Sequence, residues 1–190
     1  MQKQEQLDWE ARVGRFVAAG AFGSAILLFV WLIYANSIVD QAPSDTVEGL
    51  RVVRDHDGQV LVATFLQALA TSLLAVPLWF LFKAAKARRP ETPSAAKWLA
   101  LVAPPAMAVI TIVRQFVQID VARRVTTDLS ASPRPPAAAN DFAKAQLSSG
   151  TAPVLEALVL ATTLALAFAF VLVSLNSMRA GLLSRFMGIL

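Results

Sequence analysis

Long runs of apolar residues divide the chain, and charged or polar residues bound each run. Residues 16–39 and 59–82 contain no charged side chain, and residues 154–178 contain only Glu156, near their start. At about 1.5 Å rise per residue, some 20 helical residues cross the roughly 30 Å hydrocarbon core of a membrane. The pattern therefore predicts three transmembrane helices at these positions, the second of them kinked by Pro77.

Residues 97–116 form a shorter apolar run whose ends are charged. Lysine and arginine stems at Lys97 and Arg114 are long enough to carry their charges toward water. Pro104-Pro105 inside the run indicates a bend or a broken helix. We expect a fourth, kinked transmembrane helix here. The fold class is then all-α, a polytopic membrane bundle that forms one integral membrane domain over residues 1–190.

Two short helices are predicted on either side of the first span. Residues 1–15 mix acids and bases with apolar residues at near-helical spacing, which indicates a separate interfacial helix. After the span, Ser44 is a suitable N-cap for a second helix lying on the membrane surface. Its apolar residues Val47, Leu50 and Val53 recur every three positions.

A longer amphipathic helix follows Arg114, because apolar residues recur there every four positions, at Val117, Val121, Val125 and Leu129. It either prolongs the third span into water or lies along the outer leaflet. The proline-rich residues 130–139 predict a linker. Asn140 is then expected to cap a brief helix, which Ser148-Ser149-Gly150 ends before Pro153 opens the last span.

The basic segment 83–97 sets the predicted orientation. It carries five of the chain's Lys and Arg residues against a single acid, Glu91. Short loops of this kind stay on the cytoplasmic side. With this loop and both ends of the chain inside, ten Lys and Arg residues lie inside and seven outside. We therefore expect a multi-pass protein of the cell membrane with a cytoplasmic N-terminus.

Composition agrees with a membrane protein, since 56% of the residues are apolar and 16% are charged, against roughly 25% charged in an average soluble domain. The formal charge of +4 suggests anionic lipid headgroups as partners. Nucleic acid is not an expected partner, because no run of the sequence mixes basic residues with exposed aromatic ones. The expected cytoplasmic contacts to lipid or a partner are Lys83, Lys86, Arg88, Arg89, Arg179 and Arg185.

Residues that could carry chemistry are few. The chain has no cysteine and a single histidine, His56, and it lacks the common catalytic and phosphate-binding motifs. Asp55-His56-Asp57 offers metal-ligand types, but adjacent residues point in different directions, so a polar turn is the simpler interpretation. We expect no enzyme activity and no catalytic, cofactor or metal site.

Three polar residues inside the spans are candidates for a role. Gln67 and Thr71 stand four apart and share a helix face, where they can bond a neighbouring helix or line a solute path. Glu156 is expensive in hydrocarbon and can mark a function. The N-terminus of a helix also stabilises a carboxylate electrostatically, so Glu156 can occupy this position without having a function.

Small residues repeat along the last span at Ala157, Ala161, Ala165 and Ala169. Such a stripe lets another helix approach closely. The favoured hypothesis is therefore a structural or interaction bundle that binds a membrane partner or a second copy of itself. The alternative is a small-solute transporter or channel subunit, and a lipid-modifying enzyme ranks last because acids and histidines are scarce.

Two segments resemble a known family: Lys86-Ala-Arg-Arg-Pro-Glu-Thr-Pro93 and Leu175-Asn-Ser-Met-Arg-Ala-Gly-Leu-Leu-Ser-Arg-Phe-Met-Gly188. Together they are similar to a family of uncharacterised multi-pass membrane proteins of actinobacteria. The resemblance implies a bacterial protein in which residues 179–188 lead into further membrane helices. It implies no activity, and no functional residue is carried over from it.

Overall fold

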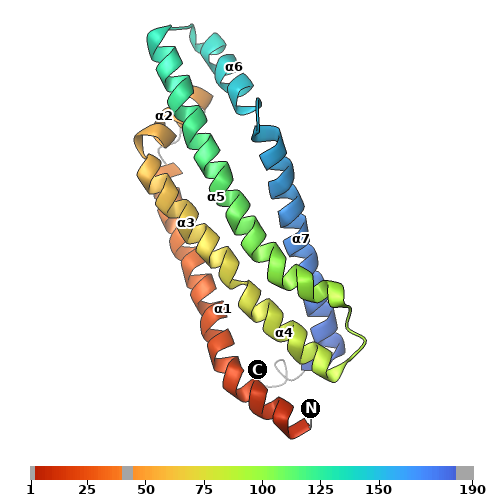
Figure 1. Ribbon diagram of the computed structural model, residues 1–190. Helices are drawn as coiled ribbons and strands as arrows, with labels where there is room; N and C mark the ends of the chain where they lie inside the picture. The colour runs from red at the N-terminus through yellow and green to blue at the C-terminus, as the bar shows by residue number, and fades with distance from the viewer. Residues whose placement is uncertain (1–2, 40–44, 183–190) are drawn as a thin grey trace.

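The fold is a bundle of helices, seen in a computed structural model that describes residues 3–39 and 45–182 (Figure 1). Within these residues every regular element is an α-helix, which confirms the all-α class. The helices are α1 (Lys3–Val39), α2 (Thr46–Asp55), α3 (Asp57–Leu73), α4 (Ala75–Arg88), α5 (Ser94–Ala131), α6 (Pro136–Leu147) and α7 (Ala152–Arg179).

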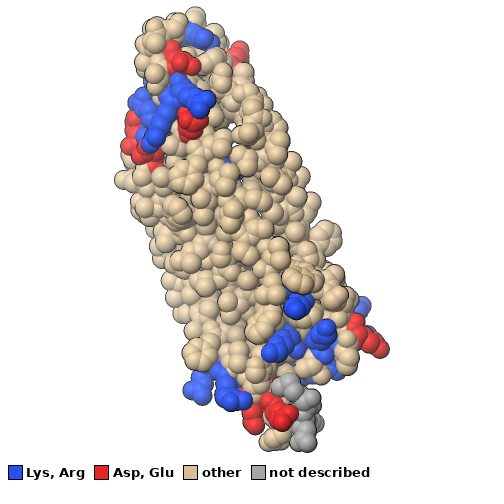
Figure 2. Space-filling view, in the orientation of Figure 1, with Lys and Arg blue, Asp and Glu red and all other residues tan. Residues whose placement is uncertain are grey.

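Four helical stretches are long and apolar enough to cross a membrane: α1, α3 with α4, α5, and α7. They contain the four predicted spans, so the chain is a multi-pass membrane protein. Figure 2 shows the consequence on the visible face, where charged side chains gather at the two ends and leave a broad uncharged waist. We call the end with α2 and α6 the cap end, and the end with the α4–α5 turn the loop end.

The helix α5 is the centre of the bundle, because it packs on α3, α4 and α7. The outer helix α1 packs on α3 and α4 instead. Near the loop end a buried cluster joins α4, α5 and α7, made of Leu78, Phe82, Ala96, Ala100, Ala169 and Val173. Its alanines allow the helix backbones to approach closely, as small residues do in membrane bundles.

The break between α3 and α4 lies at Leu74, three residues before Pro77, and it confirms the predicted kink. Proline lacks an N–H and crowds the carbonyl four residues earlier. Around the break the Leu74 N–H bonds to the Thr71 carbonyl at 3.2 Å, which frees the Ala70 carbonyl. The fully buried hydroxyl of Ser24 on α1 donates to that carbonyl at 2.7 Å.

The N-terminal residues do not form a separate interfacial helix, because α1 runs without interruption from Lys3 to Val39. Its first turns are held against α4 by aromatic packing. Trp9 stacks on Phe80, with ring centroids 5.3 Å apart, and meets the edge of Trp79 at 6.4 Å. An ion pair between Glu10 and Arg88, at 2.7 Å, adds to this contact.

The third span is also uninterrupted, since α5 continues through Pro104-Pro105. Of the two predictions for the amphipathic segment, the first is confirmed: α5 prolongs the third span as far as Ala131. This extension has α2 and α6 packed on it. The cap core between them consists of Val47, Leu50, Ala122, Val125, Leu129, Ala139 and Ala143.

Two predicted helix starts in the cap were wrong. The helix α2 is capped by Asp45, whose carboxylate accepts the Val47 N–H at 3.0 Å, instead of by Ser44. The helix α6 begins at Pro136, because proline is well suited to a first helical position. Asn140 lies inside α6, and its side-chain oxygen accepts the same Val47 N–H at 3.2 Å. That contact ties α6 to the start of α2.

Candidate functional site

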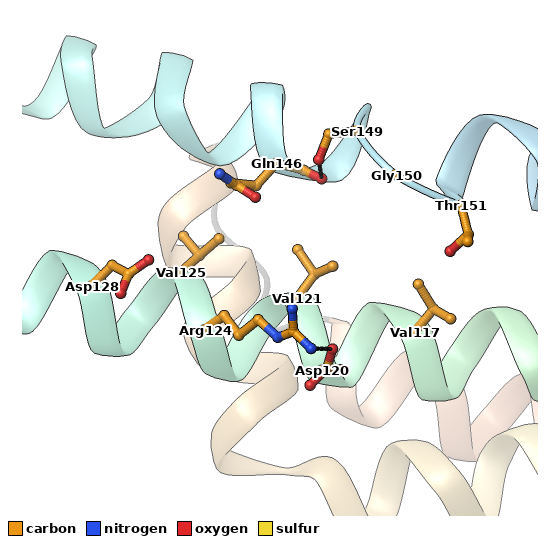
Figure 3. A pocket seen from close by; sticks show the side chains of 10 residues that line it. All are labelled: Val117, Asp120, Val121, Arg124, Val125, Asp128, Gln146, Ser149, Gly150 and Thr151. Carbon is orange, nitrogen blue, oxygen red and sulfur yellow. Dashed lines mark hydrogen bonds and ion pairs between the residues drawn. The ribbon is translucent and has the colours of Figure 1, made fainter.

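A groove opens at the cap end, between α5 and the corner that joins α6 to α7 (Figure 3). Its volume is about 540 Å³, within the range of pockets that hold small molecules. Two walls face each other across it: valines and charged side chains of α5 on one side, and polar residues of the corner on the other. The lining residues are Val117, Asp120, Val121, Arg124, Val125, Asp128, Gln146, Ser149, Gly150 and Thr151.

The α5 wall follows from four-residue spacing, which places side chains on one helix face. Val117, Val121 and Val125 form an apolar stripe, and its last member is buried in the cap core. Asp120 and Arg124 each stand one position before a valine of this stripe, and Asp128 follows Arg124 by one turn, so the three charged residues form a second stripe beside it. An apolar and a charged strip therefore run side by side along the α5 wall of the groove.

The opposite wall depends on the turn at Gly150. Gly150 has φ +63°, a left-handed conformation that glycine adopts without steric cost. The turn directs the chain from α6 into α7, as the sequence predicted. Figure 3 shows Thr151 facing Val117 and Gln146 facing Val125 across the groove.

The charged strip alternates in sign along α5. Arg124 pairs with Asp120 one turn below at 2.8 Å, and both side chains are more than half exposed. An exposed pair at this helical spacing is worth only a few tenths of a kcal/mol, so Arg124 is readily available to another anion. Asp128, one turn above Arg124, has no ion pair among the residues that the structure describes. The strip thus reads carboxylate, guanidinium, carboxylate.

A second ion pair lies just below the groove and joins α5 to α7. Arg114 contacts Glu156, with 2.7 Å between nitrogen and oxygen. Glu156 was a candidate residue because a lone carboxylate is costly in hydrocarbon. Its pairing with Arg114 gives the acid a structural partner and joins the two helices below the groove.

The other intramembrane candidates lie apart from Glu156. Thr71 donates to the carbonyl of Gln67 in its own helix at 2.8 Å, instead of bonding a neighbouring helix. Threonine hydroxyls commonly reach the carbonyl four residues earlier. Both residues are on α3, which packs on α1 and α5, whereas Glu156 is on α7. The structure does not gather the three into one site.

The predicted basic contacts at the loop end are partly engaged within the chain. The Lys83 ammonium lies over the ring of Trp9 at 4.3 Å and over Trp79 at 5.1 Å, a cation–π arrangement. Arg88 pairs with Glu10, as described above. These two residues therefore fasten α1 to α4 as well as adding positive charge.

Of the remaining basic candidates, Lys86 is exposed and Arg89 is half-buried. Lys86 lies over Phe82 at 5.8 Å, and Arg89 is 3.5 Å from Glu91 in a loose surface pair. Arg179 is the last residue of α7 and is also exposed. Arg185 lies outside the described residues. Positive charge at this end thus remains accessible to lipid headgroups.

The residues Asp55-His56-Asp57 have three separate partners. Asp55 pairs with Arg54 at 2.8 Å, and the His56 Nδ1 lies 3.1 Å from the Val52 carbonyl, to which it donates. Asp57 pairs with Arg123 of α5. In the part of the chain that the structure describes, no three His, Cys, Asp or Glu residues form a group that could hold a metal ion.

The alanine stripe of α7 is divided between the interior and the surface. Ala169 is fully buried against α4 and α5, and Ala165 is half-buried. Ala157 and Ala161, nearer the cap end, are exposed. The stripe therefore supports packing within the chain at one end and leaves a small-residue face free at the other.

Sequence reasoning missed the groove and the Ser24 contact. The amphipathic pattern after Arg114 identified the α5 wall, but nothing local placed the α6–α7 corner opposite it. Ser24 is one of several hydroxyl residues in the spans, and only the break at Leu74 distinguishes it. Comparisons with protein-family models, with curated proteins and with solved structures found no match to this chain.

Proposed function

We propose that this protein is a membrane interaction bundle, which packs against another membrane protein or a second copy of itself and carries out no catalysis. One observation supports this proposal most strongly. The most apolar windows of α1 and α7 are only 11% buried within the chain, against 28% for the other two spans. The two outer helices thus offer long faces that lipid or a partner must cover.

The exposed part of the alanine stripe is the proposed contact on α7. Ala157 and Ala161 lie among large exposed side chains, including Leu158 and Leu160. Small residues in such a surface allow a second helix to approach closely, and van der Waals packing then favours association. The Arg114–Glu156 pair holds this part of α7 in place against α5.

The proposed location is the cell membrane of a bacterium, with the loop end in the cytoplasm. Lysines and arginines of the 83–97 segment support this orientation through the positive-inside rule. They would also attract anionic headgroups of the inner leaflet. In this orientation the cap and its groove face the outer side of the membrane.

Small-solute transport has less support than interaction. The residues that suggested it, Gln67, Thr71 and Glu156, lie on different parts of the bundle, and none of them lines the outer groove. A flux assay in proteoliposomes addresses transport directly. Flux that Gln67→Ala or Glu156→Gln abolishes would favour transport over the proposal.

The interaction face can be tested by enlarging its small residues. We expect Ala157→Leu with Ala161→Leu to reduce self-association or partner recovery at least about threefold, because each added side chain separates the helix backbones. The measurement is crosslinking in native membranes, followed by sizing in detergent. Ala167→Leu, an exposed position elsewhere on α7, is the matched control. Unchanged assembly in the double variant would contradict the proposal.

A further inference from the structure

We propose that the outer groove binds the headgroup of a phospholipid that carries both a phosphate and a primary ammonium, as phosphatidylethanolamine does. The groove combines a guanidinium, two carboxylates and an apolar stripe in one cavity. This inference depends on the cavity and its chemistry, and it is independent of the partner face on α7.

The depth of the groove matches the headgroup layer. Counting about 1.5 Å per residue along α5, Val117 lies about 30 Å from Lys97, and Asp120 about 35 Å from it. The hydrocarbon core is roughly 30 Å thick, and headgroups extend the membrane to about 40 to 45 Å. With Lys97 at one interface, the bottom of the groove lies at the opposite edge of the hydrocarbon.

The order of charges fits the order of groups in the lipid. Arg124 directs its guanidinium down to the level of Asp120, with which it pairs at 2.8 Å. A lipid phosphate at the edge of the hydrocarbon would replace Asp120 as the partner of this guanidinium, because the exposed Asp120–Arg124 pair is weak. Asp128 lies two turns farther along α5 than that level, about 12 Å away, and the ammonium of an extended headgroup would point toward its carboxylate. Its carboxylate can accept hydrogen bonds from a primary ammonium, which has three donors.

The apolar stripe supplies a path for an acyl chain. Val113 precedes Val117 by one turn on the same stripe, below the groove, and it is exposed. Val154 of α7, three residues after Thr151, is exposed as well. A lipid seated in the groove can therefore rest its chain on an apolar surface of the adjoining spans. A free zwitterion would gain nothing from this surface.

The charge pattern also selects against other lipids. The strip of two aspartates and one arginine has a net charge of −1, which disfavours a net anionic headgroup such as phosphatidylglycerol. The trimethylammonium of phosphatidylcholine has the right charge but no N–H to donate to Asp128. Phosphatidylethanolamine is therefore the expected preference among these three lipids.

The test is native mass spectrometry of the full chain in detergent, with each of the three phospholipids added separately and matched in acyl chains. We expect the ethanolamine lipid to bind about tenfold more tightly than the other two, a difference typical of charge-assisted hydrogen bonds. Asp128→Asn should remove the preference for the ethanolamine lipid over phosphatidylcholine. Arg124→Gln should weaken the binding of both of these lipids. Asp141→Asn, at an exposed aspartate of α6 outside the groove, should change neither the affinity nor the lipid preference.

Equal binding of all three lipids, or a preference that survives both groove variants, would overturn the proposal. A preference for phosphatidylglycerol would overturn it as well. Soluble phosphoethanolamine serves as a final arm. If it binds as tightly as the lipid, the acyl chain contributes nothing, and the assignment to a membrane lipid fails.

Discussion

At the scale of single residues, the bundle depends on a few polar contacts placed at weak points of the backbone. Ser24 is the clearest of them, because it is fully buried and bonds a carbonyl that the helix break has freed. In a membrane such a carbonyl has no water to bond. One hydroxyl therefore joins α1 to α3 at the position where α3 ends.

Ser24→Ala should lower the free energy of unfolding by about 1 kcal/mol, a typical value for a hydrogen bond between membrane helices. Reversible unfolding in mixed micelles measures this change. Ser37→Ala is the control, since Ser37 is exposed and donates to the Tyr34 carbonyl of its own helix. Equal effects of the two substitutions would show that the contact between helices adds nothing.

The Arg114–Glu156 pair should show strong coupling, because losing one partner leaves a charge near hydrocarbon. We expect a double-mutant cycle with Arg114→Gln and Glu156→Gln to give about 1 kcal/mol of coupling in unfolding. The pair Asp120–Arg124 lies within one helix and farther from the hydrocarbon, so it provides the comparison and should give a few tenths of a kcal/mol. Additive effects at Arg114 and Glu156 would mean that the pair does not hold α5 to α7.

At the scale of elements, Pro77 determines where the second span bends and so which carbonyl Ser24 can reach. Proline removes one N–H and displaces the carbonyl of Leu73. The break then falls at Leu74, one turn before the proline. The bend and the contact between helices are consequently one feature, although they lie on separate parts of the chain.

Pro77→Ala should therefore change what Ser24 contributes. With the proline removed, the Leu74 N–H is free to bond the Ala70 carbonyl in a regular helix. The loss caused by Ser24→Ala should then fall to less than about half of its value in the unmodified chain. Unfolding of the two single variants and the double variant, in the same micelles, gives the comparison. Purely additive losses would contradict the link between bend and hydroxyl.

The spans could be predicted from sequence because hydropathy over some 20 residues depends little on tertiary contacts. The starts of α2 and α6 follow local signals, the Asp45 side chain and Pro136, whereas the length of α1 depends on contacts with another helix. Trp9 packs on Trp79 and Phe80 of α4, and this contact holds the first turns of α1 in line with the rest of the helix. The sequence of residues 1–15 does not indicate that contact. Asn140 bonds the start of α2, across 93 positions of sequence. The groove depends on this same long-range packing, so only its α5 wall was foreseeable.

At the scale of the whole molecule, ion pairs join the helices near both ends, and an uncharged middle lies between them (Figure 2). Glu10–Arg88 joins α1 to α4 at the loop end, and Asp57–Arg123 joins α3 to α5 at the cap end. The extended α5 reaches from one end to the other and carries the groove. The side of the membrane proposed for the α4–α5 loop therefore also decides the side proposed for the groove, because the two lie at opposite ends of the bundle.

The most direct test of this account is cysteine accessibility. The chain has no native cysteine, so a single introduced cysteine is the one thiol that can be labelled. Single cysteines replace Ala87 near the α4–α5 turn and Ala138 on α6, both exposed. We predict that a membrane-impermeant maleimide labels the Ala138→Cys variant in intact cells and labels the Ala87→Cys variant only after the cells are opened. Labelling of the Ala87→Cys variant in intact cells, or of both variants from the same side, would contradict the account.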